Sequence, residues 1–340
     1  MRLHPFFAGT SWVFSFSLGC SSAPNPPHDR EASANECTEV ASGATPTKLA
    51  EASEAFNMGD LSVRAGYLYW RTNGHAGWSG GLWSMPAGGG TASSMVDGDL
   101  THLVVNERGL YWFDFADDAL HFFGDVYGAW KIEHPNVDDL AAEPNGTGVW
   151  YTFQGTLHRF DRGTDTRWYG DWDKVAVAHM GVYSLTTKGE RGHESGELVM
   201  FRPGPETVQT FASYADQHPV ALRADDLGVV WLFSDELGTV APDGAPGSFR
   251  ILRSEKGRSF DDLAVDARYA YWTEVTDFGV AIRRAARDGS HAPETLLETR
   301  CKPTSLASDG ATVYWTTTKA FGRTGYDDMI PGAVWSAPAN

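Results

Sequence analysis

A short apolar stretch, a polar turn and an aromatic-rich stretch recur along this chain. The plainest copy runs from Leu-Ala-Val-Asp at residues 263–266 into Tyr-Trp-Thr at 271–273, and the next from Leu-Ala-Ser-Asp at 306–309 into Tyr-Trp-Thr at 314–316. Weaker copies lie at 61–70 and 103–112. A repeat of this length, whose units read as short strands and tight turns, indicates an architecture of repeated β-units.

The repeats can be counted by the second position of the aromatic pair. That position falls on Trp70, Trp112, Tyr151, Ser184, Trp231, Trp272 and Trp315. The spacing averages about 41 residues, which suits one four-stranded blade of a β-propeller. The sequence therefore predicts an all-β, seven-bladed β-propeller of four-stranded antiparallel blades over residues 45–340.

The two aromatic positions of each repeat have a simple explanation in this fold. Successive strand residues point to opposite faces of a sheet, and a blade packs against a neighbouring blade at both faces. The Tyr and the Trp can therefore both be buried, and each ring removes roughly 150–250 Å² from water. We expect these pairs to dominate the packing between blades.

The two ends of the chain are predicted to meet in the last blade. The seventh unit ends shortly after Trp335, in its third strand, so its fourth strand is missing. Residues 43–49 align in order with residues 289–296, which lead into the fourth strand of the sixth unit. We predict that residues 46–52 pair with the C-terminal strand and close the ring, because closure removes two exposed sheet edges.

The Tyr-Trp-Thr cores, with the looser Tyr-Trp pairs at 69–70 and 111–112, resemble YWTD-type repeats. Such repeats form propellers of the low-density lipoprotein receptor class and of exported bacterial proteins, including propeller lipoproteins. The resemblance covers about 295 residues. The usual fourth residue survives only as Asp114, with Glu274 and Thr317 in other units, and the receptor propellers have six blades. The resemblance therefore implies the fold, and a receptor-like role does not follow from it.

The first 19 residues have the pattern of a secretory signal. Arg2 precedes an apolar stretch at 12–18, and Gly19 stands directly before Cys20. The position of Cys20 resembles a bacterial lipoprotein signal, which implies lipid attachment at this cysteine, although Ser17 stands where such signals usually carry Leu. Residues 20–44 are rich in Ser, Ala, Pro and Asn, and such a composition predicts a flexible tether. We expect an outer-membrane or cell-surface lipoprotein, or otherwise a periplasmic or secreted protein; an uncleaved N-terminus is a further alternative.

The two remaining cysteines flank the predicted closure. Cys37 lies just before the closing strand, and Cys301 lies just before the first strand of the seventh unit. In an exported protein these positions favour a Cys37–Cys301 disulfide, while two buried free thiols are the alternative.

Composition excludes several classes of partner. The formal net charge is −17, from 44 Asp and Glu against 27 Lys and Arg. Nucleic acid and anionic lipid surfaces both require basic patches, so neither is expected, and membrane contact is expected only through the lipid anchor. The sequence holds no nucleophile elbow, zinc-protease, phosphate-loop or dinucleotide motif, and we predict no cofactor, no metal and a monomer.

Loops on one end of the propeller form the predicted binding face. They connect the second and third strands of the blades, and loops on a rigid scaffold commonly carry binding residues. The candidates are Trp78, Asp114, Asp117, Asp118, His193, Asp277, Tyr326 and Asp327. The three aspartates at 114–118 could supply oxygens to calcium, but they lack the spacing of a calcium loop, so a solvated acidic loop is the alternative. The aspartate pairs at 138–139 and 261–262 are interpreted as turn caps.

Two functions remain open. The first is a non-enzymatic binding or interaction module that presents this face to a protein or a glycan. The second is an enzyme of the lyase or glycosidase kind, with carboxylates or histidines gathered at the mouth of the central channel.

Overall fold

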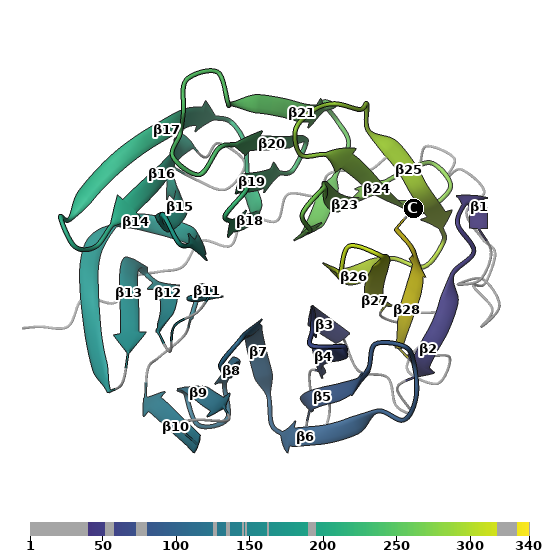
Figure 1. Ribbon diagram of the computed structural model, residues 1–340, viewed down its shortest axis with the longest axis horizontal. Coiled ribbons are helices and arrows are strands. Elements are labelled where there is room, and N and C mark those ends of the chain that lie inside the picture. Colours follow the sequence, from purple (N-terminus) through teal and green to yellow (C-terminus); the bar gives the residue numbers. More distant parts are fainter. Residues whose placement is uncertain are drawn as a thin grey trace, which may run out of the picture. The chain divides into compact units, whose positions relative to one another are not determined.

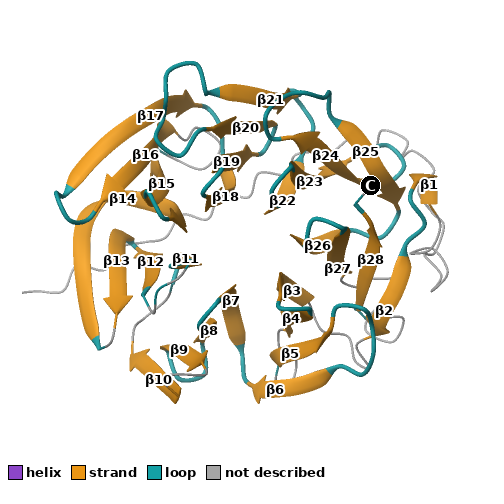
Figure 2. Ribbon diagram, viewed as in Figure 1, coloured by secondary structure: helices purple, strands orange, loops and turns teal. Residues whose placement is uncertain are grey.

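The computed structural model describes residues 40–51, 58–72, 80–124, 128–133, 137–144, 146, 148–161, 163–189, 195–317 and 332–339. All regular elements in these ranges are β-strands (Figure 2). Within the same ranges there is no helix long and apolar enough to cross a membrane.

The strands form six antiparallel sheets. Three sheets contain four consecutive strands each: β3 (Met58–Arg64), β4 (Tyr67–Thr72), β5 (Gly81–Pro86) and β6 (Ser93–Asp97); β7 (Leu100–Asn106), β8 (Gly109–Asp114), β9 (Ala119–Gly124) and β10 (Gly128–Glu133); β18 (Pro219–Asp225), β19 (Gly228–Phe233), β20 (Glu236–Val240) and β21 (Arg250–Ser254).

Two further sheets each include a strand from the N-terminal segment. The first contains β22 (Phe260–Val265), β23 (Tyr269–Val275), β24 (Val280–Ala286), β25 (Glu294–Thr299) and, on its outer edge, β1 (Val40–Gly43). The second contains β26 (Pro303–Ser308), β27 (Thr312–Thr317), β28 (Ala333–Pro338) and, on its outer edge, β2 (Thr47–Glu51).

The sixth sheet has seven strands, where the sequence predicted two separate blades. It consists of β11 (Asp139–Ala142), β12 (Val149–Phe153), β13 (Gly155–Asp161), β14 (Thr164–Ala178), β15 (Gly181–Lys188), β16 (Ser195–Arg202) and β17 (Thr207–Ala215). β14 is continuous: residues 164–172 pair with β13 and residues 172–178 pair with β15, with register shifts on both sides near residue 172. The described residues therefore form six hydrogen-bonded sheets and not seven, because no turn interrupts β14.

The sheets surround a common centre within the compact unit Ala32–Asn340 (Figure 1). Going round the centre, β3 lies beside β7, β7 beside β11, β11 beside β14, β14 beside β18, β18 beside β22, β22 beside β26, and β26 beside β3. This arrangement is a β-propeller with four-stranded antiparallel blades, as the repeat predicted.

The N-terminal segment closes the ring, as predicted. β2 pairs with β28 in a register that sets Thr47 opposite Ser336 and Glu51 opposite Ala333. The sequence did not predict the second N-terminal pairing, in which β1 adds to β25. Residues 40–43 were assigned to the tether and instead form this strand, in which Gly43 has a φ of 94° and lies so close to the Leu296 carbonyl that a β-carbon would not fit.

Cys301 follows β25 by two residues and is disulfide-bonded. Cys20 and Cys37 lie outside the described residues, so the pairing of Cys301 with Cys37 stays a prediction.

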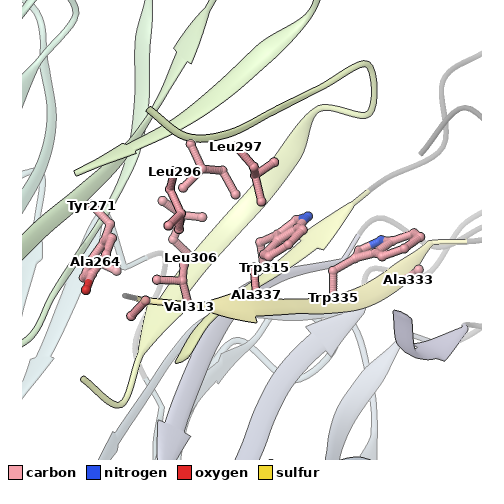
Figure 3. Packing of buried hydrophobic residues seen from close by; sticks show 12 residues of the cluster. Ala264, Tyr271, Leu296, Leu297, Leu306, Val313, Trp315, Ala333, Trp335 and Ala337 are labelled. Atoms are coloured by element: carbon pink, nitrogen blue, oxygen red, sulfur yellow. The ribbon is translucent and has the colours of Figure 1, made fainter. Parts of the chain in front are cut away.

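Packing between the sheets follows the expected alternation of the aromatic pair. Tyr271 packs with Leu306 and Trp315 in the cluster between the β22–β25 and β26–β28 sheets (Figure 3). Its neighbour Trp272 packs on the opposite face, with Leu232 of the β18–β21 sheet. Both rings are fully buried. The two aromatic positions of the repeat therefore join each blade to a different neighbour.

The aspartate that ends the apolar stretch of the repeat fixes the turn after the innermost strand. Asp266 Oδ1 accepts the N–H groups of Arg268 and Tyr269, both at 2.8 Å. Its Oδ2 accepts the hydroxyls of Tyr271 at 2.7 Å and of Ser308, on β26, at 2.8 Å. One carboxylate thus holds a turn, the aromatic pair and the adjacent sheet together.

These hydrogen bonds make a testable prediction for pH. Burial would raise the pKa of Asp266, but its four hydrogen-bond donors together hold the pKa below the ordinary value of 3.8. A carboxyl with a lowered folded-state pKa stabilises the fold above pH 3.8, and this contribution is lost as the pH falls through the folded-state pKa. We expect Asp266→Asn to cost about 2 kcal/mol of unfolding free energy at pH 7, from two lost acceptor contacts, and less at pH 3, in urea denaturation. An equal cost at both pH values would contradict this account, and the exposed Asp277→Asn serves as the control.

Candidate functional site

The predicted binding face is only partly covered by the described residues. Among the predicted candidates, Trp78, His193, Tyr326 and Asp327 lie outside them. Asp114, Asp117 and Asp118 lie at the turn between β8 and β9, and Asp277 lies in the loop between β23 and β24. These two loops belong to different sheets that are not adjacent in the ring, so the structure does not bring the two sets together.

The β8–β9 turn gathers two predicted aspartates with a histidine that the sequence did not single out. Asp114, Asp117 and His121 each offer one ligand atom, and these atoms all lie within 4.8 Å of one another. His121 Nε2 lies 3.1 Å from both Asp117 oxygens, and Lys131 Nζ lies 3.3 Å from Asp117 Oδ2. The His121 ring stacks on Trp112, with ring centroids 5.3 Å apart. Since β8 and β9 pair Trp112 with His121, the hairpin register explains how His121 reaches the turn.

The electrostatics of this turn are those of an ion-pair cluster. Slight burial would raise the pKa of Asp117, but the hydrogen bond and charge of His121, with those of Lys131, hold it below its ordinary value. Asp118, with a φ of 52°, lies on the exposed side of the turn. Three groups of the kind that bind divalent cations are present, but the Lys131 ammonium already neutralises part of their charge.

A central cavity of about 350 Å³ is the second candidate site. It is lined by residues of β3, β7, β11, β14, β18, β22 and β26, the strands nearest the centre (Figure 1). Its polar lining includes Asp60, His102, Asp139 and Arg223. Asp60, His102 and Asp139 lie in the first half of their strands, nearest the predicted binding face, where the channel mouth was expected, whereas Arg223 lies in the second half of β18.

The innermost strands bulge at this position. Asp60, His102 and Asp262 have φ values of 49°, 53° and 23°, in the left-handed region that residues other than glycine rarely occupy. Each coincides with a register shift between the innermost strand and its partner. Bulges of this kind re-aim a side chain, and they are common near functional sites.

Three carboxylates of the innermost strands accept backbone N–H groups of the neighbouring strand around the centre, and two of them, Asp60 and Asp262, lie at the bulges. Asp60 Oδ2 accepts the N–H of Leu103 at 3.1 Å, Asp139 Oδ2 accepts the N–H of Val175 at 2.8 Å, and Asp262 Oδ2 accepts the N–H of Leu306. At the junction of β26 and β3, Ser305 Oγ accepts the N–H of Leu61 at 2.8 Å. We call Asp60, Asp139, Asp262 and Ser305 the inner seam, because each joins its strand to the neighbouring strand around the centre; for Asp139 that neighbour is β14, in the same sheet.

The pKa values of two inner-seam residues move in opposite directions. Burial would raise the pKa of Asp60, but the Arg71 guanidinium, 2.5 Å away, together with His102 and the Leu103 amide holds it low. Burial raises the pKa of Asp262, and Arg223 and two backbone amides offset this only in part, while Asp60 adds to the rise. Two carboxyls whose environments separate their pKa values could serve as an acid and a base. Here each of them also has an oxygen committed to the seam.

The aspartate pairs were interpreted as turn caps, but of the four carboxylates Asp138 contacts the β12–β13 turn, Asp261 forms an ion pair, and the other two accept amides of neighbouring strands. Asp138 Oδ2 accepts the N–H of Gln154 at 2.7 Å, and Asp261 Oδ2 lies 2.7 Å from Lys302 Nζ. The second member of each pair, Asp139 or Asp262, belongs to the inner seam. The sequence could not show that Asp262 links adjacent sheets, because the bulge that re-aims its side chain leaves no mark in the apolar pattern.

Comparison with known proteins supports the β-propeller fold and indicates no narrower family or function. No protein-family model matches the chain, and no curated protein matches its sequence. Among solved structures, the extracellular domain of BT4673 from B. thetaiotaomicron has a TM-score of 0.55 at 12% identity; the match covers 85% of this chain and 39% of that one. The chain therefore spans well under half the length of that domain.

Two shorter propellers are matched over nearly their whole length. The WD40 domain of Neurospora crassa Pan2 has a TM-score of 0.59 at 9% identity, and the match covers 88% of this chain and 98% of that domain. The β-propeller domain of the Trilobed protease from Pyrococcus furiosus has a TM-score of 0.57 at 9% identity, with 83% and 96% covered. Structures with this fold thus include an extracellular domain, a WD40 domain and a domain of a protease.

Proposed function

We propose that this protein is an exported, non-enzymatic binding module, which presents the loop end of its propeller to a protein or a glycan. The observation that carries the proposal is the commitment of the inner-seam carboxylates. Asp60 and Asp262 accept backbone N–H groups of the next sheet, and Asp139 accepts one from β14 of its own sheet, so one oxygen of each carboxylate serves the ring, whereas catalysis would need it free. The loops that surround them are then the natural place for recognition.

In this proposal the ring has seven blades, two of which share β14. The first half of β14 is mostly exposed, as the outer strand of a blade would be, and its second half is mostly buried and lines the central cavity, as an innermost strand would. The long strand would therefore be the fourth strand of one blade and the first strand of the next.

Export and anchoring complete the proposal. The signal-like residues 1–19 and Cys20 support lipid attachment, with the residues up to 39 as a tether. The register of β1 and β25 sets Val40 opposite Thr299, two residues before the disulfide-bonded Cys301. This favours Cys37 as the disulfide partner of Cys301, which peptide mapping by mass spectrometry without reduction would decide.

The binding face can be tested with matched aromatic substitutions. A panel of glycans and cell-envelope proteins is bound to the intact chain, and Trp78→Ala with Tyr326→Ala is compared with Tyr67→Ala. Tyr67 is 47% exposed and begins β4 at the β3–β4 turn, at the opposite end from the loops, so it controls for the loss of an exposed ring. We expect the loop substitutions to abolish capture and the control to leave it intact. Capture that survives both loop substitutions would exclude this face.

A lyase- or glycosidase-type enzyme is the second candidate, and it rests on the opposite pKa shifts of Asp60 and Asp262. If this pair acts on a substrate in the central cavity, which Asp60 lines, Asp60→Asn should abolish turnover of aryl glycosides or of uronate polymers while the chain stays folded. Absence of turnover by the unaltered chain on both substrate classes would reject this candidate.

A further inference from the structure

A second cavity opens at the opposite end of the propeller from the loops discussed so far. It has a volume of about 420 Å³ and lies between the β18–β21 and β22–β25 sheets. Its walls are the turns that join the first to the second strand and the third to the fourth strand of these sheets. The proposed binding face lies at the other end of the strands, so this cavity and that face are separate sites.

The cavity collects positive charge in a protein whose net charge is −17. Its lining includes Arg250, Arg268, Arg287, His291, Ser248 and Ser290. One carboxylate, Asp288, also lines it, and its Oδ1 accepts the N–H of Ser290 at 2.9 Å. Guanidinium and hydroxyl groups are the side chains that bind carboxylate, sulfate and phosphate groups.

Arg287 lies at the base of the cavity, and a carboxylate already neutralises the charge of its guanidinium group. It is 8% exposed and donates to both oxygens of Asp225, at 2.5 and 2.7 Å. It also donates to the carbonyls of Asp266 at 2.9 Å and Gly228 at 3.2 Å. With its donors used in this way, Arg287 holds the two sheets together beneath the cavity.

Arg250 and Arg268 differ from most arginines of this chain. Arg71, Arg159 and Arg283 form ion pairs with carboxylates, whereas within the described residues neither Arg250 nor Arg268 does so. Both are exposed to solvent at the cavity.

Two contacts hold these guanidinium groups in place. Arg250 donates to the carbonyl of Asp288, and the Arg268 guanidinium lies 5.3 Å from the centroid of the Tyr269 ring. Arg284 lies 4.7 Å from the same ring and pairs with Glu294, which fixes the ring in turn. Two oriented cations therefore face one cavity, and among the described residues neither forms a close ion pair, although hydrogen bonds from Ser290 and, in part, the charge of Arg250 hold the pKa of Asp288 below its ordinary value.

We propose that this cavity binds an oxyanion group, a carboxylate, sulfate or phosphate, through the guanidinium groups of Arg250 and Arg268. His291 lies on the same wall and can supply a further donor, whereas the Ser248 hydroxyl already donates to the Ala245 carbonyl at 2.6 Å and the Ser290 side chain already hydrogen-bonds to Asp288. The negative charge of Asp288 repels a bound anion. It therefore lowers the affinity of the cavity for the anion and favours a position of the anion close to Arg268.

Isothermal titration of the intact chain with sodium phosphate, sodium sulfate and sodium acetate, at constant ionic strength, tests the proposal. We expect saturable binding of at least one anion, and the three arms show whether tetrahedral oxyanions or carboxylates are preferred. Arg250→Gln and Arg268→Gln should each weaken binding about tenfold or more, as expected for a charge-assisted hydrogen bond. Asp288→Asn should strengthen it, because it removes a like charge.

Arg108→Gln is the matched control, since Arg108 is an exposed arginine in a turn at the same end of a different sheet. It should leave the affinity unchanged. The proposal is overturned if the unaltered chain binds none of the three anions, or if the Arg250→Gln Arg268→Gln double variant binds as tightly as the unaltered chain. The melting curve of each variant confirms folding, and if the double variant unfolds, Arg268→Gln alone decides the outcome.

Discussion

A chain that lacks residues 40–51 is expected to melt roughly 10 °C or more below the intact chain. The deletion removes β1 and β2, which are the outer strands that pair with β25 and β28. Loss of about four net backbone hydrogen bonds and of the partly buried Leu49 costs about 5 kcal/mol, a large part of the stability of a typical domain. Two long sheet edges also become exposed, so aggregation should accompany the loss.

Deletion of residues 21–35 is the control for this experiment. It shortens the predicted tether by a similar length and keeps both Cys37 and the two strands. Thermal unfolding followed by circular dichroism should place this control close to the intact chain. If the 40–51 deletion melts together with the control, the N-terminal strands do not support the ring.

Asp225→Asn is expected to destabilise the fold by about 3 to 5 kcal/mol in urea denaturation. The substitution keeps an oxygen that can accept the N–H groups of Leu227 and Gly228, and it removes the charge that Arg287 meets at 2.5 and 2.7 Å. Arg287 is buried, so its guanidinium would remain without a counter-charge between two sheets. The full cost of an uncompensated buried cation should therefore appear.

A double-mutant cycle separates this effect from simple loss of packing. Adding Arg287→Met to Asp225→Asn should recover part of the stability, because the buried charge is then gone as well. Glu294→Gln, which breaks the more exposed pair with Arg284, should cost less than about 1 kcal/mol. Equal losses of unfolding free energy for Asp225→Asn and Glu294→Gln would show that the buried ion pair stabilises the fold no more than the exposed one.

The repeat in the sequence predicted the features of the fold that depend on burial at two faces. The Tyr271 and Trp272 pair is divided between two neighbouring sheets as alternation requires. The closing pair of β2 and β28 was visible because the last unit lacked a strand that the N-terminal segment could supply. Both inferences used positions where side-chain burial or strand count leaves a mark in the residues.

Features that depend on backbone geometry could not be predicted. The sequence of β14 carries Gly170 and Asp171 at the change of partners, which reads as a turn, yet the chain continues as one strand. The addition of β1 to β25 depends on main-chain groups and on the close passage of Gly43. His121 joined the acidic turn only through the register of a hairpin.

The residues of the candidate sites fall into the same two groups: those that the sequence could predict and those that depend on backbone geometry. The loop positions of Asp114, Asp117 and Asp277 followed from the strand order, whereas the inner seam depends on bulges at Asp60 and Asp262. A bulge changes the direction of a side chain without changing the apolar pattern. The arginines of the anion cavity were equally hidden, because they lie in turns of two different sheets.

Closure of the ring by the N-terminal strand is tested most directly by a crosslink between its two partners. Thr47 and Ser336 lie opposite each other in the pairing of β2 and β28, within the range that a disulfide can span. Under mild oxidation, Thr47→Cys with Ser336→Cys should form an intramolecular disulfide in nearly all molecules, detected by mass spectrometry of a digest without reduction. Ala50→Cys with Ser336→Cys, which pairs residues that are not opposite each other, should not. An account with a closed ring is contradicted if the first pair stays reduced, or if it links only two different molecules.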